Sequence, residues 1–375
     1  MSRQPIAFYA PLKAPDHPHP SGDRTMARLL LRALDRAGFA PAVASGLRTW
    51  EPAGDPARKD AIRAESMVEA DRLTASYEAL PADRRPRAWF TYHCYYKAPD
   101  HLGPEMARRL GIRYAIAEAS RAPKRAHGIH AAGHAAAERA IDCADMLFVM
   151  TRHDRACLER AARPGQALVN LPPFIDPDAF AIAPGRTGEE RPPRLLAVAM
   201  MRDGDKLASF RLLAEALARI QNLPWLIDVV GDGPARPEVE RILAPFGARV
   251  ALRGRLEGAD LTVAYTEADL LVWPAVNEAY GMVLLEAQAN GCPVVAGRFG
   301  GVPDVVVDGT TGLLAEPGNA AALGEGVASL LADPLRCAAM GEAARRFVRE
   351  ERSLDRAARI LGDALQPLIG TRAAS

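Results

Sequence analysis

The chain has 375 residues, of which 49% are hydrophobic and 25% are charged, and its formal net charge is +1. This length suits two domains of ordinary size, each with enough apolar residues to bury a core of its own. The balanced charge gives no support for a nucleic-acid-binding protein, whose surface carries a strong basic excess.

The first half of the chain alternates short apolar segments with helical patterns, which is typical of an α/β fold with a parallel sheet. Ser21 is well placed to cap a helix over Asp23–Gly38, whose apolar residues recur on one face. The other elements predicted here are strands over Pro5–Tyr9, Pro41–Ala44, Ala88–Tyr92, Tyr114–Ala117 and Met146–Met150, and helices over Asp60–Leu80 and Pro104–Leu110.

A proline-rich segment, Leu171–Pro177, and a polar stretch that ends at Pro192 and Pro193 separate the two halves. Extended proline segments suit linkers between domains. We therefore predict an N-terminal domain over residues 1–185, a boundary at roughly 181–193 and a C-terminal domain over residues 190–350, followed by a terminal helix over residues 352–370.

The second half repeats the same alternation and predicts a second parallel sheet. Open parallel sheets bind ligands beyond the carboxyl ends of their strands, so two doubly wound domains can face a shared cleft. The predicted strands are Leu195–Ala199, Leu226–Val230, Val250–Arg253, Leu270–Trp273 and Pro293–Ala296. The predicted helices are Leu207–Ile220, Arg236–Ala244, Asp260–Thr266, 281–290, Ala320–Ala332, Pro334–Arg349 and Leu354–Ile369.

Two acidic residues, Glu278 and Glu286, bracket the start of the helix that Gly281 opens. The amides of Gly281, Met282 and Val283 have no intrahelical partner there, and they favour an anion. At about 1.5 Å rise per residue, the two carboxylates can stand about 10 Å apart, which is the span of a sugar diphosphate from its hexose to its ribose. The pattern therefore predicts a nucleotide-sugar site. The alternatives are a surface glutamate at position 286 and a helix-dipole role for Glu278.

The segment Pro274–Gly318 resembles the donor-site signature of retaining glycosyltransferases of family four, which have the GT-B architecture of two Rossmann-like domains facing a cleft. The similarity continues upstream through Val229–Pro234 and Arg253–Leu256, and it is weak over the first 180 residues. It implies transfer of a sugar from a nucleoside diphosphate sugar, with retention of configuration and with no metal or other cofactor. It also implies that the terminal helix crosses back to the N-terminal domain.

The resemblance also implies roles for single residues. A basic pair on a loop after a strand suits a diphosphate, and two solvated surface cations are the alternative. By position, Arg202 and Lys206 would bind the diphosphate, Glu278 the donor sugar, Glu286 the ribose, the backbone of Arg253 and Gly254 the base, and the turn at Gly22 the donor phosphate. The fit at the basic pair is imperfect, because Met201 replaces the family's usual glycine and the spacing is one residue short.

On the acceptor side, His93 follows an apolar strand and is predicted to face the cleft as a catalytic residue. The alternative is a partly buried histidine among Tyr92, Tyr95 and Tyr96. The family often has a histidine after the next strand, where this sequence has Glu118. The acceptor predicted from the resemblance is a saccharide, a lipid-linked sugar or a small metabolite.

Two further patterns are interpreted without a ligand. Gly231-Asp232-Gly233 lacks the third glycine of a dinucleotide-binding fingerprint, so we interpret it as a turn at the end of a strand. His127, His130, His134 and Glu138 have spacings compatible with one helix face, but glycines weaken that helix and no zinc motif is present, so we predict no metal site.

The five cysteines form no C-x-x-C pair, and the N-terminus has no apolar run of signal-peptide length. We therefore predict a cytoplasmic protein, with contact to the inner membrane face open through the basic cluster Arg121, Lys124 and Arg125. Two other function classes stay open: a sugar-nucleotide epimerase, and a non-catalytic protein that binds sugar nucleotides.

Overall fold

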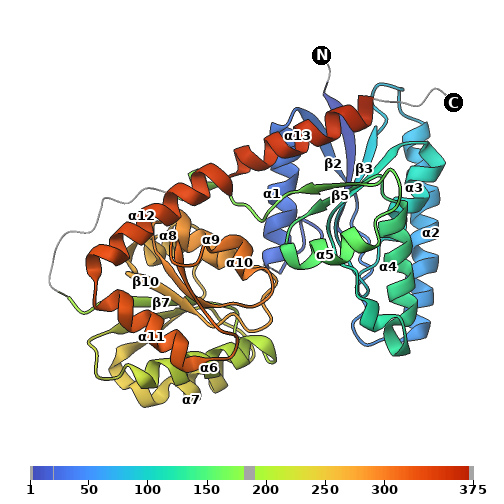
Figure 1. Ribbon diagram of the computed structural model, residues 1–375. Helices are drawn as coiled ribbons and strands as arrows, with labels where there is room; N and C mark the ends of the chain where they lie inside the picture. The colour runs from blue at the N-terminus through green and yellow to red at the C-terminus, as the bar shows by residue number, and fades with distance from the viewer. Residues whose placement is uncertain (1–2, 20, 181–190, 371–375) are drawn as a thin grey trace. The chain divides into compact units, whose positions relative to one another are not determined.

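The computed structural model describes residues 3–19, 21–180 and 191–370. The chain forms two compact units, Met1–Pro172 with Leu354–Ser375, and Pro173–Ser353. The division falls in the proline-rich segment, and most of the predicted linker at 181–193 lies outside the described residues. The predicted α/β fold with two parallel sheets is confirmed, because the described part of each unit contains a six-stranded parallel sheet with helices packed on it (Figure 1).

Unit 1, the unit that contains the N-terminus, has the strand order β2-β1-β3-β4-β5-β6. Figure 1 shows α2, α3 and α4 along one face of this sheet and α1 with α13 along the other. Its strands are β1 (Gln4–Tyr9), β2 (Phe39–Ser45), β3 (Ala88–Cys94), β4 (Arg113–Ala119), β5 (Met146–Val149) and β6 (Ala167–Asn170). Its helices are α1 (Gly22–Arg36), α2 (Pro56–Glu78), α3 (Leu102–Leu110), α4 (Ala131–Cys143), α5 (Arg152–Arg160) and α13 (Leu354–Gly370), with 3₁₀ turns at Pro123–Arg125 and Gly128–His130.

Unit 2 has the strand order β12-β11-β10-β7-β8-β9. In Figure 1, α6, α7 and α11 lie on one face of its sheet and α8, α9 and α10 on the other. Its strands are β7 (Arg194–Val198), β8 (Leu226–Val230), β9 (Val250–Gly254), β10 (Leu270–Trp273), β11 (Val294–Gly297) and β12 (Gly312–Ala315). Its helices are α6 (Asp205–Arg219), α7 (Arg236–Leu243), α8 (Gly258–Glu267), α9 (Met282–Ala289), α10 (Val302–Val305), α11 (Ala320–Leu331) and α12 (Pro334–Glu351), with 3₁₀ turns at Pro177–Ala179 and Ala244–Arg249.

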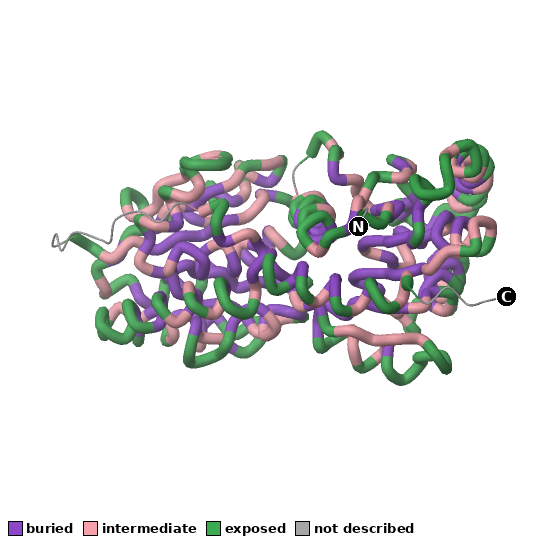
Figure 2. The backbone as a smooth tube through the Cα atoms, turned by 90° about the horizontal axis from the view of Figure 1, so that it is seen from above, coloured by how far each residue is buried: buried purple, intermediate pink, exposed green. Residues whose placement is uncertain are grey.

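The inner strands of both sheets are buried and mostly apolar, as parallel strands covered on both faces must be, whereas the edge strands β2, β6 and β9 are partly exposed. Figure 2 shows buried backbone running through the middle of each unit, with exposed helix surfaces around it. The N-terminus of α1 follows the sequence prediction: the Ser21 hydroxyl accepts a hydrogen bond from the Arg24 amide at 3.2 Å. On the same helix, Arg36 forms an ion pair with Asp355 of α13, which packs along α1.

Both sheets contain a point where the strand order reverses. In unit 2 the chain runs from β7 outward through β8 and β9, and then returns to place β10 on the other side of β7. In unit 1 the reversal lies between β1 and β3. Connections that leave two such neighbouring strands diverge to opposite faces of the sheet, which opens a crevice at the carboxyl edge. None of the described helices is long and apolar enough to cross a membrane.

The sequence analysis did not predict β6, β12, α4, α5 or α10. For α4 the reasoning from glycine was wrong, because Gly133 lies inside this helix rather than ending it. A Cβ at Gly133 would stand 2.2 Å from the Tyr96 carbonyl oxygen, so the missing side chain allows α4 to pack against the β3–α3 loop.

Candidate active site

The crevice between β7 and β10 in unit 2 brings predicted site residues together. Lys206 lies in the first turn of α6, Glu278 lies in the loop after β10, and the two side chains form an ion pair. They are 21% and 18% exposed, respectively, so the pair is partly shielded from water. The same two segments are joined at 2.8 Å by Asn277 Nδ2, which donates to an Asp205 carboxylate oxygen. These contacts fix the β10–α9 loop against the start of α6.

The β10–α9 loop is held in an uncommon backbone conformation. Ala275 and Asn277 have φ values of 57° and 50°, a left-handed region that costs free energy for residues other than glycine. The Glu278 amide donates to the Ala275 carbonyl at 3.0 Å, which closes the turn. Gly300, in the loop after β11, packs so closely that a Cβ there would stand 2.3 Å from the Glu278 carbonyl oxygen. The turn closed by Ala275 and the close approach of Gly300 therefore fix the position of the Glu278 backbone, from which its side chain extends.

Helix α9 begins beside this loop. Gly281 is its N-cap residue, with φ 77°, and Met282 is its first residue. Within the described chain, the amides of Gly281, Met282 and Val283 donate no hydrogen bond to another segment. Arg202, on the β7–α6 loop, is exposed and has no ion pair with any described residue. The crevice thus combines unpaired amides with a free guanidinium group, and both favour an anion.

Glu286 lies in the second turn of α9 and is bound by a residue that the sequence analysis missed. The Tyr265 hydroxyl, from α8, donates to Glu286 Oε2 at 2.7 Å. Burial raises the pKa of Glu286, and the tyrosine hydrogen bond opposes that shift. Burial and the charge of Glu286 raise the pKa of Tyr265 well above its usual value, so the tyrosine remains a hydrogen-bond donor. The pattern of Tyr265 in the sequence is that of an ordinary core aromatic, so only the contact reveals its role.

The Gly231-Asp232-Gly233 turn supports the β7–α6 loop that carries Arg202. A Cβ at Gly231 would stand 1.8 Å from the Ala199 carbonyl oxygen, and one at Gly233 would stand 2.3 Å from the Met201 carbonyl oxygen. The Met201 amide also donates to the Asp232 carbonyl at 3.0 Å. The two glycines therefore allow the turn after β8 to lie directly against the loop after β7.

Arg253 and Gly254 end β9, and both are engaged within unit 2. Arg253 Nε donates to Asp228 Oδ1 at 2.7 Å, and the Gly254 carbonyl accepts from the Gly231 amide at 2.8 Å. Gly22 lies in unit 1, where it is the exposed first residue of α1. These three residues are thus not part of the Lys206–Glu278 crevice contacts.

In unit 1, His93 forms the centre of an acidic cluster at the carboxyl ends of β3 and β4. Its Nδ1 lies 3.0 Å from Asp23 Oδ1, in the first turn of α1, and 3.7 Å from Glu118 Oε1. His93 and Glu118 both have positive φ, at 62° and 59°, and the His93 ring packs at a tilt against Tyr95 with a centroid distance of 4.8 Å. The alternative of a partly buried histidine among tyrosines therefore describes these surroundings, the carboxylates were not foreseen, and a catalytic role for His93 stays a prediction.

These carboxylates determine the charge of His93. Burial alone would lower its pKa, but Glu118, the hydrogen bond to Asp23 and the nearby Asp154 outweigh burial and raise the pKa to about 9. Burial raises the pKa of Glu118, and the positive charge of His93 opposes that shift. At neutral pH, His93 is consequently an imidazolium ion that holds two acidic side chains at the edge of the sheet.

We expect this cluster to make stability depend on pH in a defined window. The folded-state pKa of His93 lies above its unfolded value of about 6.5, so its contribution is complete below that pH and is lost as pH rises through about 9. Urea unfolding of the wild type should therefore lose at most about 3 kcal/mol between these limits, and His93→Gln should remove this part of the slope. His101→Gln is the control, because the pKa of His101 is lowered to about 4 and it stays neutral throughout. An unchanged slope in His93→Gln would contradict the assignment.

The other histidines do not form the helix face considered in the sequence analysis. His127 and His130 precede α4, and only His134 and Glu138 lie on it, with His134 Nε2 3.7 Å from Glu138 Oε1. Glu138 also forms an ion pair with Arg121. In the described ranges, no group of three or more His, Cys, Asp or Glu side chains is arranged to hold a metal ion.

Comparison with known proteins gives a consistent family. Residues 192–333, which contain the unit 2 site, match the family described as Glycosyl transferases group 1. A GDP-mannose-dependent alpha-(1-6)-phosphatidylinositol monomannoside mannosyltransferase from Mycolicibacterium smegmatis is 31% identical over 265 residues, which is 60% of this chain and 66% of that protein. A D-inositol 3-phosphate glycosyltransferase from Corynebacterium efficiens is 41% identical over 110 residues, which is 28% of this chain and 26% of that protein. The matched segments thus span less than two thirds of the length of these relatives.

Solved structures show the same fold at low sequence identity. Sucrose-phosphate synthase from Thermosynechococcus elongatus superposes with a TM-score of 0.74 at 20% identity, over 99% of this chain and 100% of the other. HepE from Anabaena, solved in complex with UDP, gives a TM-score of 0.72 at 14% identity, over 96% and 99% of the two chains. Residues 192–333 of this chain thus match glycosyl transferases group 1, and the fold of the chain is of the GT-B type.

Proposed function

We propose that this protein transfers a glycosyl group from a nucleoside diphosphate sugar to an acceptor hydroxyl, with retention of configuration and without a metal. The observation that carries the proposal is the set of side chains and amides that the structure brings together after the carboxyl ends of β7 and β10. There Glu278, the unpaired amides at the start of α9 and Glu286 follow one another along one loop and helix, with Lys206 of α6 paired to Glu278 and Tyr265 of α8 bound to Glu286. Cations and amides suit a diphosphate, and the carboxylates on either side suit the hydroxyls of a sugar and a ribose.

The chemical difficulty is the departure of the diphosphate, which gains negative charge as the sugar gains positive charge. Arg202, Lys206 and the amides of Gly281–Val283 would stabilise that negative charge, as donors fixed in advance around a leaving group do. Glu278 would exchange part of its ion pair with Lys206 for donor-sugar hydroxyls, and Glu286 would bind the ribose. The backbone of Arg253 and Gly254 stays our candidate for the base contact, and Gly22 for a contact to the donor phosphate.

Retention is proposed to follow from reaction on the front face of the donor sugar, where the leaving phosphate accepts the proton of the acceptor hydroxyl. On the acceptor side we assign the cluster of His93 and Glu118. Because His93 is a cation at neutral pH, its role would be to orient the acceptor and the carboxylates rather than to remove a proton. The acceptor class is a saccharide, a lipid-linked sugar or a small metabolite. The names of two relatives, which include an inositol phosphate and a phosphatidylinositol mannoside, favour a phosphorylated acceptor.

Binding of UDP, GDP, ADP and their sugar conjugates, measured by calorimetry with and without EDTA, tests the donor site. We expect one base to be selected, the affinity to survive EDTA, and Glu286→Ala to weaken binding by about ten-fold or more, as the loss of hydrogen bonds to a charged group does. Glu257→Ala is the matched control, since Glu257 is exposed and precedes α8. Failure of every nucleotide to bind would overturn the proposal.

Turnover separates the remaining function classes. With a competent acceptor, NMR of the product should show the anomeric configuration of the donor sugar retained. Formation of an epimer without any acceptor would instead identify an isomerase. Tight nucleotide-sugar binding with no turnover across an acceptor screen would identify a binding protein.

A further inference from the structure

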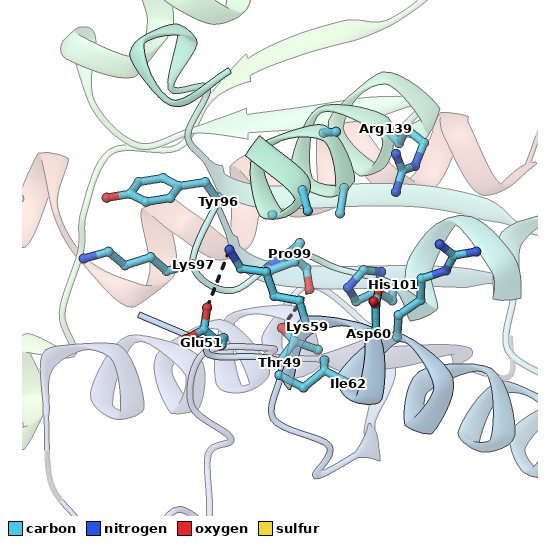
Figure 3. A pocket seen from close by; sticks show the side chains of 15 residues that line it. Thr49, Glu51, Lys59, Asp60, Ile62, Tyr96, Lys97, Pro99, His101 and Arg139 are labelled. Atoms are coloured by element: carbon cyan, nitrogen blue, oxygen red, sulfur yellow. Dashed lines mark hydrogen bonds and ion pairs between the residues drawn. The ribbon is translucent and has the colours of Figure 1, made fainter. Parts of the chain in front are cut away.

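Unit 1 contains a polar pocket that is separate from the His93 cluster. It has a volume of about 190 Å³ and lies between the N-terminal half of α2, the β3–α3 loop and α4. Figure 3 shows Lys59, Lys97, His101 and Arg139 around it, with Lys59 directed toward Glu51. Neither the nucleotide-sugar site nor the acceptor-side residues assigned above line this pocket.

The charge in the pocket is predominantly positive. Four cations line it, namely Lys59, Arg63, Lys97 and Arg139, against the acids Glu51 and Asp60. Glu51 is already engaged: its carboxylate accepts from the Ala53 and Gly54 amides at 2.8 Å each and lies 3.6 Å from Lys59 Nζ. Apart from the Glu51–Lys59 pair, the pocket lining contains one acid, Asp60, and three cations. These cations are Arg63, Lys97 and Arg139, and none of them forms an ion pair with a described residue.

Arg63 and Arg139 approach the pocket from opposite helices, α2 and α4. In the parts of the chain that the structure describes, neither guanidinium makes an ion pair or a hydrogen bond. Both are close enough to His101 to act on it: burial, then Arg139 and Arg63, lower its pKa to about 4. The pKa of the adjacent His130 is likewise lowered, by burial and by Lys59, Lys97 and Arg125. Two arginines without a protein partner, on opposite walls of one pocket, are suited to bind an anion between them.

We propose that this pocket binds the phosphate group of a small hydroxylated molecule. Arg63 and Arg139 would bind the phosphate oxygens, Lys97 would add a third cation, and Asp60 would accept hydrogen bonds from ligand hydroxyls, which a carboxylate suits and a phosphate does not. Anion binding here does not depend on the donor site. Identification of the ligand as the acceptor of glycosyl transfer rests on the proposed function.

Calorimetry with glycerol 3-phosphate on the intact protein, at constant ionic strength, tests the site, with glycerol as the uncharged comparison. We expect glycerol 3-phosphate alone to bind, and Arg63→Ala and Arg139→Ala each to weaken binding by about ten-fold. Both side chains are exposed, so the fold should tolerate their loss. The matched control is Arg84→Ala with Arg87→Ala, which removes two exposed positive charges before the start of β3.

The double variant combines Arg63→Ala with Arg139→Ala. Three results would overturn the site: glycerol binds as tightly as glycerol 3-phosphate, the control variant loses as much affinity as the arginine variants, or the double variant still binds glycerol 3-phosphate normally. Binding that Arg202→Ala abolishes and the double variant leaves intact would place the phosphate in the donor crevice, and would also overturn it. Vesicles of phosphatidylcholine with and without phosphatidylinositol distinguish the source of the phosphate. Sedimentation only with phosphatidylinositol, lost in the double variant, identifies a lipid headgroup, and glycerol 3-phosphate binding without sedimentation identifies a soluble ligand.

The acceptor assignment has its own readout. If the pocket holds the acceptor, the double variant Arg63→Ala with Arg139→Ala should raise the acceptor KM by about ten-fold or more, and leave the affinity for the nucleotide unchanged. Phosphate binding with no nucleotide binding would retain the site and remove the proposed function. Nucleotide binding and transfer with an unchanged acceptor KM would retain the function and remove the acceptor assignment.

Discussion

Lys206→Ala is expected to lower the rate of glycosyl transfer by about two to three orders of magnitude, the usual cost of removing one donor to a developing negative charge. Lys206 is positioned for this because its ammonium lies over Trp273, with Nζ 5.6 Å from the ring centroid, and binds Glu278. The alanine variant also leaves Glu278 partly buried without its cation, which is costly in its own right. Steady-state kinetics with saturating acceptor should show the loss mainly in kcat.

A double-mutant cycle separates the two effects of this substitution. Lys206→Met keeps an unbranched side chain of similar length without the charge, and Glu278→Gln removes the charge of its partner. If Lys206 acts only by holding Glu278, the double variant should be no slower than Glu278→Gln alone. If it also stabilises the leaving diphosphate, the double variant should be slower still. Arg202→Ala is the companion test, because that side chain is exposed and its loss should reduce activity without reducing the free energy of unfolding. Full activity in both Lys206→Met and Arg202→Ala would show that the diphosphate binds elsewhere.

The sequence predicted the sheet regions well because buried parallel strands are short apolar runs flanked by turn residues. Strands β8 and β10 were predicted with the bounds they have in the structure, Leu226–Val230 and Leu270–Trp273. Strand β12 was missed because Gly312–Ala315 is short, begins with glycine and follows a turn. Helix α4 was missed because glycine propensity argued against it, and tertiary packing outweighed that propensity.

Residues of the candidate site could be proposed from the sequence where their chemistry follows from local spacing, and could not where it depends on contacts between distant segments. Glu278, Gly281 and Glu286 are adjacent along one loop and helix, so their spacing was informative. The partners of these groups, Lys206 and Tyr265, come from other helices. Lys206 was proposed as one of a basic pair on a loop after a strand, an interpretation that the family resemblance favoured, and Tyr265 was not proposed at all. Likewise, the glycines of the turn after β8 are explained by the β7–α6 loop beside them, which local sequence does not specify.

The second large effect is expected at Gly231, in the turn after β8, and concerns the stability of the fold. Gly231→Ala is expected to reduce the free energy of unfolding by about 4 kcal/mol or more, because the new Cβ would stand 1.8 Å from the Ala199 carbonyl oxygen. The contact is with backbone, which no side-chain rotation can relieve, and Gly231 also has φ 139°, where an alanine is strained. Urea or thermal unfolding measures the loss.

The turn also links stability to the proposed site. To accommodate the Cβ, the β7–α6 loop must move away from β8, and that loop carries Arg202. Protein that remains folded at low temperature should therefore bind the nucleoside diphosphate more weakly than the wild type. Gly258→Ala is the control, since Gly258 also has positive φ, at 55°, but no atom lies within 4 Å of its added Cβ. It should lose only about 1 kcal/mol, the ordinary cost of alanine in that backbone region, and it should bind nucleotide normally. Equal losses in the two variants would show that backbone strain alone, and not the contact between the loops, requires glycine at position 231.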